Sequence, residues 1–161
     1  MNQKNQQSFL KSQLINASLR FLGYRSRSQQ EIIQYLQQRT ADQDLVDQII
    51  NYLKELKLID DQAFASQYAS SLVRSKLKGP KYIQQKLQHL GVSQSDIQQA
   101  INSLSPKIQL KSALKFLHKK NRYIFKYPVH QQKLKASQYL YNQGFSGSIL
   151  QQAIDEYFID E

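Results

Sequence analysis

Apolar residues recur at every third or fourth position in three stretches of the chain, and polar residues fill most positions between them. The recurring positions are Val46, Ile49, Ile50 and Leu53, then Ile97, Ala100, Ile101 and Leu104, and last Leu150, Ala153, Ile154 and Tyr157. This spacing puts the apolar side chains on one face of an α-helix. No segment shows the sustained alternation of a strand, so the sequence predicts an all-α protein.

A motif that leads into these helices is written three times. It begins at Gly91, returns at Gly144 after 53 residues, and occurs in a fainter form at Thr40, 51 residues before Gly91. Repetition with such a period indicates stacked supersecondary units. A short turn joins the last two helices of each unit, as in a helix-turn-helix. We therefore predict three tandem three-helix, helix-turn-helix-like repeats.

Capping residues set the expected helix bounds. Gly91 and Gly144 suit left-handed C-terminal caps of the second helices. The side-chain oxygens of Asp42, Ser93 and Ser146 are expected to cap the third helices. The first helices are then expected at 14–22, 61–76 and 108–120, and the second helices at 32–38, 82–90 and 133–143. These bounds predict a flexible N-terminal segment at 1–12, repeats at 13–59, 60–105 and 106–161, and an insertion at 121–130 in the third repeat.

Positive charge is concentrated in the second and third repeats. The chain of 161 residues has a formal net charge of +10. Residues 62–154 contain fourteen Lys and Arg against a single acid, Asp96, whereas residues 1–61 are nearly neutral and the last seven residues carry four acids. Such clustering indicates a polyanionic partner such as nucleic acid. With no cysteine and no apolar run that could act as a signal peptide or span a bilayer, we expect a soluble, cytoplasmic protein.

Catalytic and metal-binding patterns are missing from the sequence. There is no phosphate-binding GxxxxGK motif. His89, His118 and His130 stand apart from one another and from paired carboxylates, so no metal site is expected. We therefore expect a binding protein with no catalytic residue, metal or cofactor.

The expected third helices carry no Lys or Arg over their apolar rows, which argues against insertion into a DNA major groove. The basic residues lie instead on the first and second helices. Lys107, Lys111, Lys115 and Lys119 form a stripe at i, i+4 spacing, which indicates either a partner that relieves their repulsion or a solvated face. Residues 122–127 mix cations with rings that suit stacking on single-stranded nucleic acid; equally, Ile124 and Phe125 suit a role as core anchors.

Three segments in fixed order resemble the RecX family of recombination regulators. They are the run 23–32, the run 53–65, and Lys78-Gly79-Pro80 followed by Ile83, Leu87, Gly91 and Val92. The resemblance covers about residues 15–104 well, and residues 107–158 only in architecture. Lys86 departs from it, because an acidic residue is expected there.

The resemblance implies an elongated, curved monomer that lies in the helical groove of a RecA filament on single-stranded DNA. It implies a protein that limits filament growth, ATP hydrolysis and strand exchange, with no membrane partner. Double-stranded DNA is a further candidate partner. The predicted interface with RecA or DNA consists of Arg25, Arg27, Arg74, Lys76, Lys78, Lys81, Lys86, Lys111, Lys115, Lys119, Lys120, Arg122 and Lys126. Two alternatives stay open: a nonspecific DNA-binding or architectural protein without a recombinase partner, and a helical adaptor for an acidic protein.

Overall fold

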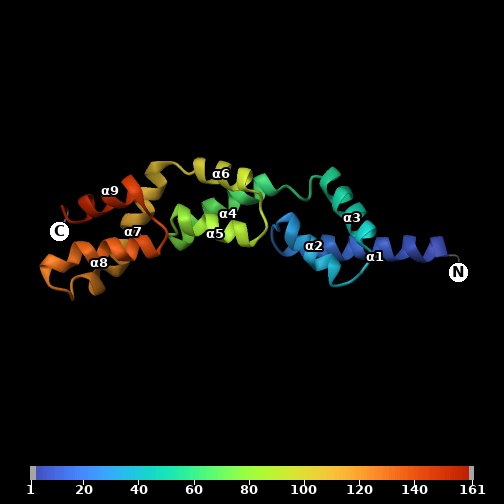
Figure 1. Cartoon of the computed structure of the whole chain (residues 1–161), viewed down its shortest axis with the longest axis horizontal. Helices are drawn as coiled ribbons and strands as arrows, with labels where there is room; N and C mark the ends of the chain where they lie inside the picture. The colour runs from blue at the N-terminus through green and yellow to red at the C-terminus, as the bar shows by residue number, and fades with distance from the viewer. Residues whose placement is uncertain (1–2, 160–161) are drawn as a thin grey trace.

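The structure, a computed structural model, describes residues 3–159. This part of the chain forms nine α-helices and no strand, grouped in three successive units (Figure 1). Unit 1 contains α1 (Gln3–Tyr24), α2 (Gln29–Gln37) and α3 (Gln43–Glu55); unit 2 contains α4 (Asp61–Lys76), α5 (Pro80–His89) and α6 (Gln94–Asn102); unit 3 contains α7 (Pro106–Ile124), α8 (Val129–Asn142) and α9 (Gly147–Tyr157). The units follow one another along the long axis, which confirms the predicted stack of three-helix repeats.

Each unit has a hydrophobic core of its own. The repeated apolar rows supply much of it: Val46, Ile49 and Leu53 are fully buried in unit 1, and Ile97 and Ala100 in unit 2. Unit 3 closes around the fully buried side chains of α7, α8 and α9, among them Leu117, Leu140 and Tyr157. Burial of these rows is the main force that holds the three helices of a unit together.

Most of the expected caps are present. The side chains of Asp42 and Ser93 accept hydrogen bonds from backbone amides three residues on, and Gly91 and Gly144 have left-handed φ angles of 74° and 97°. The expected cap at Ser146 is wrong, because its side chain makes no capping hydrogen bond. Its φ of −160° and the left-handed φ of 61° at the next residue differ from the geometry at Ser93, so the hydroxyl does not reach the first-turn amides.

Helix extends into two segments for which no helix is expected. The segment 1–12, expected to be flexible, is part of α1 from Gln3 on; residues 1 and 2 lie outside the described part. It contains no Pro or Gly, so helix propagates from the packed part around Leu14. Within the expected insertion at 121–130, α7 continues to Ile124, residues 125–128 form a turn, and α8 begins at Val129. Ile124 is fully buried in the core of unit 3, and this burial stabilises the last turn of α7.

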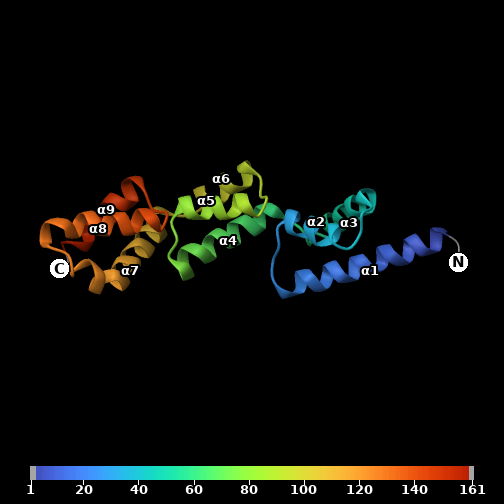
Figure 2. The same cartoon turned by 60° about the horizontal axis from the view of Figure 1, so that its bottom comes forward.

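The second helices form a head-to-tail row along the molecule. In both views α8, α5 and α2 follow one another along the long axis (Figures 1 and 2). Where units 1 and 2 meet, the hydroxyl of Ser28 donates to the carbonyl of Leu90 at 2.6 Å, and the amide of Gln29 donates to Asp61 at 2.7 Å. Where units 2 and 3 meet, the amide of Gly79 donates to the carbonyl of Gln143 at 3.0 Å. At each joint a donor at the start of one second helix thus binds a free carbonyl at the end of another, and this donor is the hydroxyl of Ser28 at the first joint and the amide of Gly79 at the second.

Candidate nucleic-acid and protein interface

Among the described residues, no Lys or Arg of units 2 and 3 has an acidic partner. Within residues 5–159 the only ion pairs join Glu31 to Arg25 at 2.6 Å and to Arg27 at 3.3 Å, both in unit 1. The surface of unit 1 therefore differs from that of units 2 and 3 in how many of its cations are paired with an acid. Glu31 neutralises cations of unit 1, whereas those of units 2 and 3 face solvent, lie near rings or, as at Lys78, donate to the neutral side chain of a glutamine.

Arg25 and Arg27 take part in the capping of α2. Glu31 accepts from both guanidinium groups and from the amide of Ser28, which itself forms a capping box with Glu31. Partial burial raises the pKa of Glu31, but the hydrogen bonds from Arg25 and from the Ser28 amide outweigh this effect, so that the pKa lies below its ordinary value. The side chain of Arg27 is only 15% exposed and stacks 3.9 Å over the ring of Phe21. Of the two predicted interface residues, Arg25 is therefore the more accessible.

Three predicted interface lysines gather with two tyrosines across the joint between units 2 and 3. Lys78 and Lys86 lie 4.2 Å and 5.6 Å from the ring of Tyr82, and Lys81 lies 4.8 Å from the ring of Tyr141 on α8. Tyr141 is 59% exposed. We call these five residues the lysine–tyrosine surface. Cations beside exposed rings suit nucleic acid, which offers phosphates and stacking bases together.

A second group of cations and rings surrounds the end of α7. Lys120 lies 5.2 Å from the ring of Tyr123 and 5.9 Å from that of Tyr139. Lys126 lies 5.8 Å from the ring of Tyr123, which is 53% exposed. Of the two anchors considered for this region, Ile124 is buried in the core, whereas Phe125 is 40% exposed and lies 6.3 Å from the ring of Tyr157.

The remaining predicted residues divide between a groove and open surface. Between α4 and α7 lies a groove with a volume of about 390 Å³. It is lined by Arg74, Leu77, Lys107, Ile108, Lys111, Ser112 and Lys115, and we call it the α4–α7 groove. It brings together Arg74 of unit 2 with most of the lysine stripe of unit 3. Lys76, Lys119 and Arg122 are exposed and do not line it.

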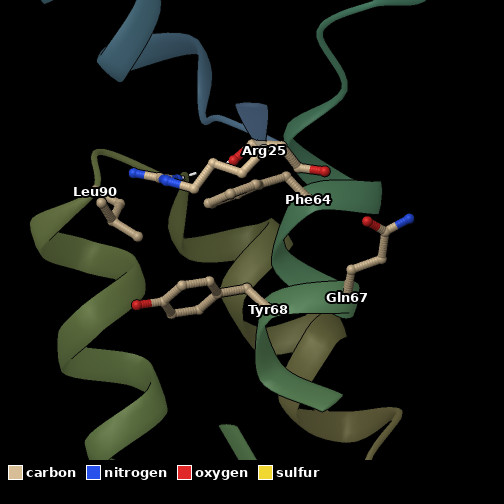
Figure 3. Close-up of a pocket in the computed structure, with 6 residues that line it drawn as sticks. Arg25, Phe64, Gln67, Tyr68 and Leu90 are labelled. Carbon is tan, nitrogen blue, oxygen red and sulfur yellow. Dashed lines mark hydrogen bonds between the residues drawn. The ribbon is translucent and has the colours of Figure 1, made fainter. Parts of the chain in front are cut away.

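A further hollow lies between units 1 and 2. Its volume is about 470 Å³, and its walls include Arg25, Phe64, Tyr68 and Leu90. In Figure 3 Arg25 extends past the ring of Phe64, and the ring of Tyr68 reaches from α4 toward the helix that ends near Leu90. Its single cation is already paired with Glu31. This hollow therefore has apolar walls and little free positive charge, unlike the α4–α7 groove.

Sequence reasoning missed the tyrosines and the apolar floor of the groove. Lys78, just before α5, and Tyr82 and Lys86 on α5 follow one another at steps of four residues, and this spacing could have indicated their proximity. Tyr141 and Leu77 gave no such signal, because only the packing of unit 3 on unit 2 brings them to these surfaces. In the described residues no group of three or more His, Asp or Glu side chains is placed to hold a metal ion. Over the same residues, none of the helices combines the length and the apolar character needed to cross a membrane.

Two family models match the chain. Residues 15–53 match the first three-helix domain of RecX and residues 60–101 match the second. These segments correspond to most of units 1 and 2 and together span just over half of the chain.

Curated relatives and solved structures agree with this match. The regulatory protein RecX of Limosilactobacillus reuteri (strain DSM 20016) is 31% identical over 138 residues, which are 86% of this chain and 52% of the relative. The regulatory protein RecX of Oceanobacillus iheyensis is 34% identical over 140 residues, which are 86% of this chain and 51% of the relative. The chain thus spans about half the length of the curated relatives it matches.

The crystal structure of RecX from Lactobacillus salivarius superposes with a TM-score of 0.87 at 28% sequence identity, over 94% of this chain and 99% of that one. A second crystal structure, of regulatory protein RecX, gives a TM-score of 0.84 over 96% of this chain and 78% of that one. Because these superpositions cover nearly the whole chain, they include unit 3, which neither family model reaches. Taken with the two domain matches, this likeness shows that the chain belongs to the RecX family.

Proposed function

We propose that this protein is a negative regulator of RecA, which binds in the groove of the RecA filament on single-stranded DNA. In this role it limits filament growth, ATP hydrolysis and strand exchange. The observation that carries the proposal is the lysine–tyrosine surface, which crosses the joint between units 2 and 3 in a member of the RecX family. The relatives are named regulatory proteins, which supports a binding role over catalysis. This role implies a cytoplasmic protein.

The elongated shape supports contact with a filament. Three units in a row present an extended surface, and such a surface suits a partner that is itself a polymer. Within the described part of the chain the cations of units 2 and 3 have no acidic partner, so they add attraction for a polyanion without first breaking an ion pair. Aromatic rings beside these cations favour single-stranded over double-stranded nucleic acid, because bases in a duplex are already stacked.

The proposal is tested by adding the protein to preformed RecA filaments on single-stranded DNA. The rate of ATP hydrolysis and the filament length, seen by electron microscopy, are both expected to fall. The variant Lys81→Glu/Lys86→Glu reverses two charges of the lysine–tyrosine surface and is expected to lose most of this effect. The matched control Arg20→Glu/Lys57→Glu makes the same change of charge at exposed positions of unit 1 and should behave as the parent.

The alternative of a nonspecific DNA-binding or architectural protein is favoured by the same surface. It predicts binding to naked DNA whose affinity falls steeply with salt, because each phosphate that is neutralised releases counterions. If RecA filaments keep their length and ATPase rate at concentrations that saturate naked DNA, the regulator proposal fails and this alternative stands. Failure to bind DNA or filaments at all would favour a helical adaptor for an acidic protein.

A further inference from the structure

The α4–α7 groove has an apolar floor between its cations. Leu77 is 4% exposed and ends α4 in a left-handed conformation, with its amide donating to the carbonyl of Leu72. Ile108 is half-buried and packs against the core of unit 2, although it belongs to α7 of unit 3. The floor is therefore built at the joint and is supported by a hydrophobic core beneath it.

Four cations surround this floor. Arg74 comes from the last turn of α4, and Lys107, Lys111 and Lys115 follow one another along α7 at steps of four residues, about 6 Å each. None of them has an acidic partner within the described residues. Cations at this spacing repel one another, and a ligand with several negative charges would relieve that repulsion.

The lining of the groove differs from the lysine–tyrosine surface in its lack of aromatic rings, and this difference favours a protein ligand over nucleic acid. The lining contains no aromatic ring, whereas every lysine of the lysine–tyrosine surface lies near a tyrosine. A nucleic acid offers phosphates and planar bases, so it would leave an aliphatic floor such as Leu77 and Ile108 without a matching group. A protein segment offers carboxylates and aliphatic side chains together.

We propose that the α4–α7 groove binds an acidic protein segment that inserts one aliphatic side chain between Leu77 and Ile108 and places its carboxylates against Arg74 and the lysines of α7. A groove of about 390 Å³ has room for a side chain of this size. The occupant contacts α4 and α7 at once and therefore holds units 2 and 3 together. This inference deepens the proposed function, on which it rests for the expectation of a protein partner, and it divides the basic surface into a protein-binding and a DNA-binding part.

The test uses a fluorescein-labelled synthetic peptide of aspartates and glutamates around one central leucine, with binding to the full chain followed by fluorescence anisotropy. A second peptide carries serine in place of the leucine. We expect the leucine peptide to bind more tightly by about tenfold or more, because a leucine side chain gains that much from burial. The variant Lys111→Glu/Lys115→Glu is expected to lower the affinity for the leucine peptide about tenfold or more. The matched control Arg20→Glu/Lys57→Glu makes the same change of charge at exposed positions of unit 1, away from the groove, and should bind as the parent does.

Three results would overturn the inference. Equal affinity for the leucine and serine peptides would mean that the apolar floor takes no side chain. Equal loss in the groove variant and the control variant would mean that only net charge matters. Displacement of the leucine peptide by oligothymidylate, with oligothymidylate binding weakened equally in the groove variant, would assign the groove to nucleic acid. The assay contains no RecA, so its failure would leave the filament test of the proposed function standing, and the reverse is also true.

Discussion

Gly79 and Gly144 pack directly against each other where units 2 and 3 meet. A β-carbon added at Gly79 would lie 2.3 Å from the carbonyl carbon of Gly144, which is backbone and has little freedom to move. The same contact includes a hydrogen bond of 3.1 Å from the amide of Lys81 to the carbonyl of Gly144. Gly144, the glycine of the repeated motif in unit 3, therefore ends α8 and also contacts the backbone of unit 2 at Gly79.

We expect Gly79→Ala to destabilise the protein by about 1–3 kcal/mol, because the added methyl group forces the two units apart. Urea unfolding followed by circular dichroism measures the change. Gly23→Ala is the matched control, because a β-carbon at Gly23 has no atom within 4 Å. Gly23 lies in the last turn of α1, where alanine favours helix over glycine. This control should leave stability unchanged or raise it by up to about 1 kcal/mol. Equal stability of the two variants would contradict the role of the glycine contact.

A ladder of four stacked groups ties α1 to α2. The rings of Phe21 and Tyr35 lie 4.1 Å apart with their planes inclined by 9°, and Arg27 and Arg39 cover the outer faces at 3.9 Å and 3.6 Å. A double-mutant cycle of Phe21→Leu and Tyr35→Leu is expected to show a coupling free energy of about 0.5–1.5 kcal/mol. Additive effects in urea unfolding would mean that the rings contribute by burial alone.

Glu31→Gln is expected to lower stability at neutral pH and to have less effect in acid. The pKa of Glu31 is lower in the folded protein than its ordinary value, so the ionised carboxylate stabilises the fold above that ordinary value. This contribution is lost as the pH falls through the folded pKa. Thermal unfolding at a series of pH values should show the curves of parent and variant approaching one another below about pH 4, near the ordinary pKa of glutamate. A constant difference over that range would show that the charge of Glu31 is irrelevant.

Asp61→Asn is expected to show the opposite dependence. Burial raises the pKa of Asp61, the hydrogen bond from the Gln29 amide opposes this, and Asp96 adds to the rise. With a folded pKa above the unfolded value, the parent loses stability as the pH rises from that value through the folded pKa. Asparagine still accepts a hydrogen bond from Gln29 but does not ionise. The stability of the variant relative to the parent, measured by thermal unfolding, should therefore increase as the pH rises above about 4. An increase only in acid would contradict a raised pKa of Asp61.

Tyr141→Ala is expected to weaken binding to single-stranded DNA by about 1–3 kcal/mol, the contribution of one stacked base. Fluorescence anisotropy with labelled oligothymidylate measures the affinity. Tyr24→Ala provides the control, because Tyr24 is 85% exposed and lies in unit 1, away from the lysine–tyrosine surface. A similar loss in both variants would indicate nonspecific contact of exposed rings with DNA.

Local patterns were sufficient to predict the helices. The apolar rows of α3 and α6 and the caps at Asp42 and Ser93 appear in the structure as expected, because amphipathic spacing and side-chain capping depend on neighbours within one or two turns. The expected limits failed at the start of α1 and at the end of α7. At the end of α7 the burial of Ile124, a tertiary contact, continues the helix beyond its expected end at residue 120 and into the segment expected as an insertion.

The sequence by itself determined that the protein is helical, repeated and strongly basic in units 2 and 3, since periodicity and charge are properties of the residues in order. Only the tertiary structure decided which cations lie together. Arg74 and Lys111 are 37 residues apart in the chain and line one groove, whereas Lys119 belongs to the same stripe as Lys111 and lies outside it. The reason is that the packing of one unit on the next determines which helix faces meet. This packing depends on contacts between units, such as those of Ser28 and Gly79, which a linear pattern does not contain.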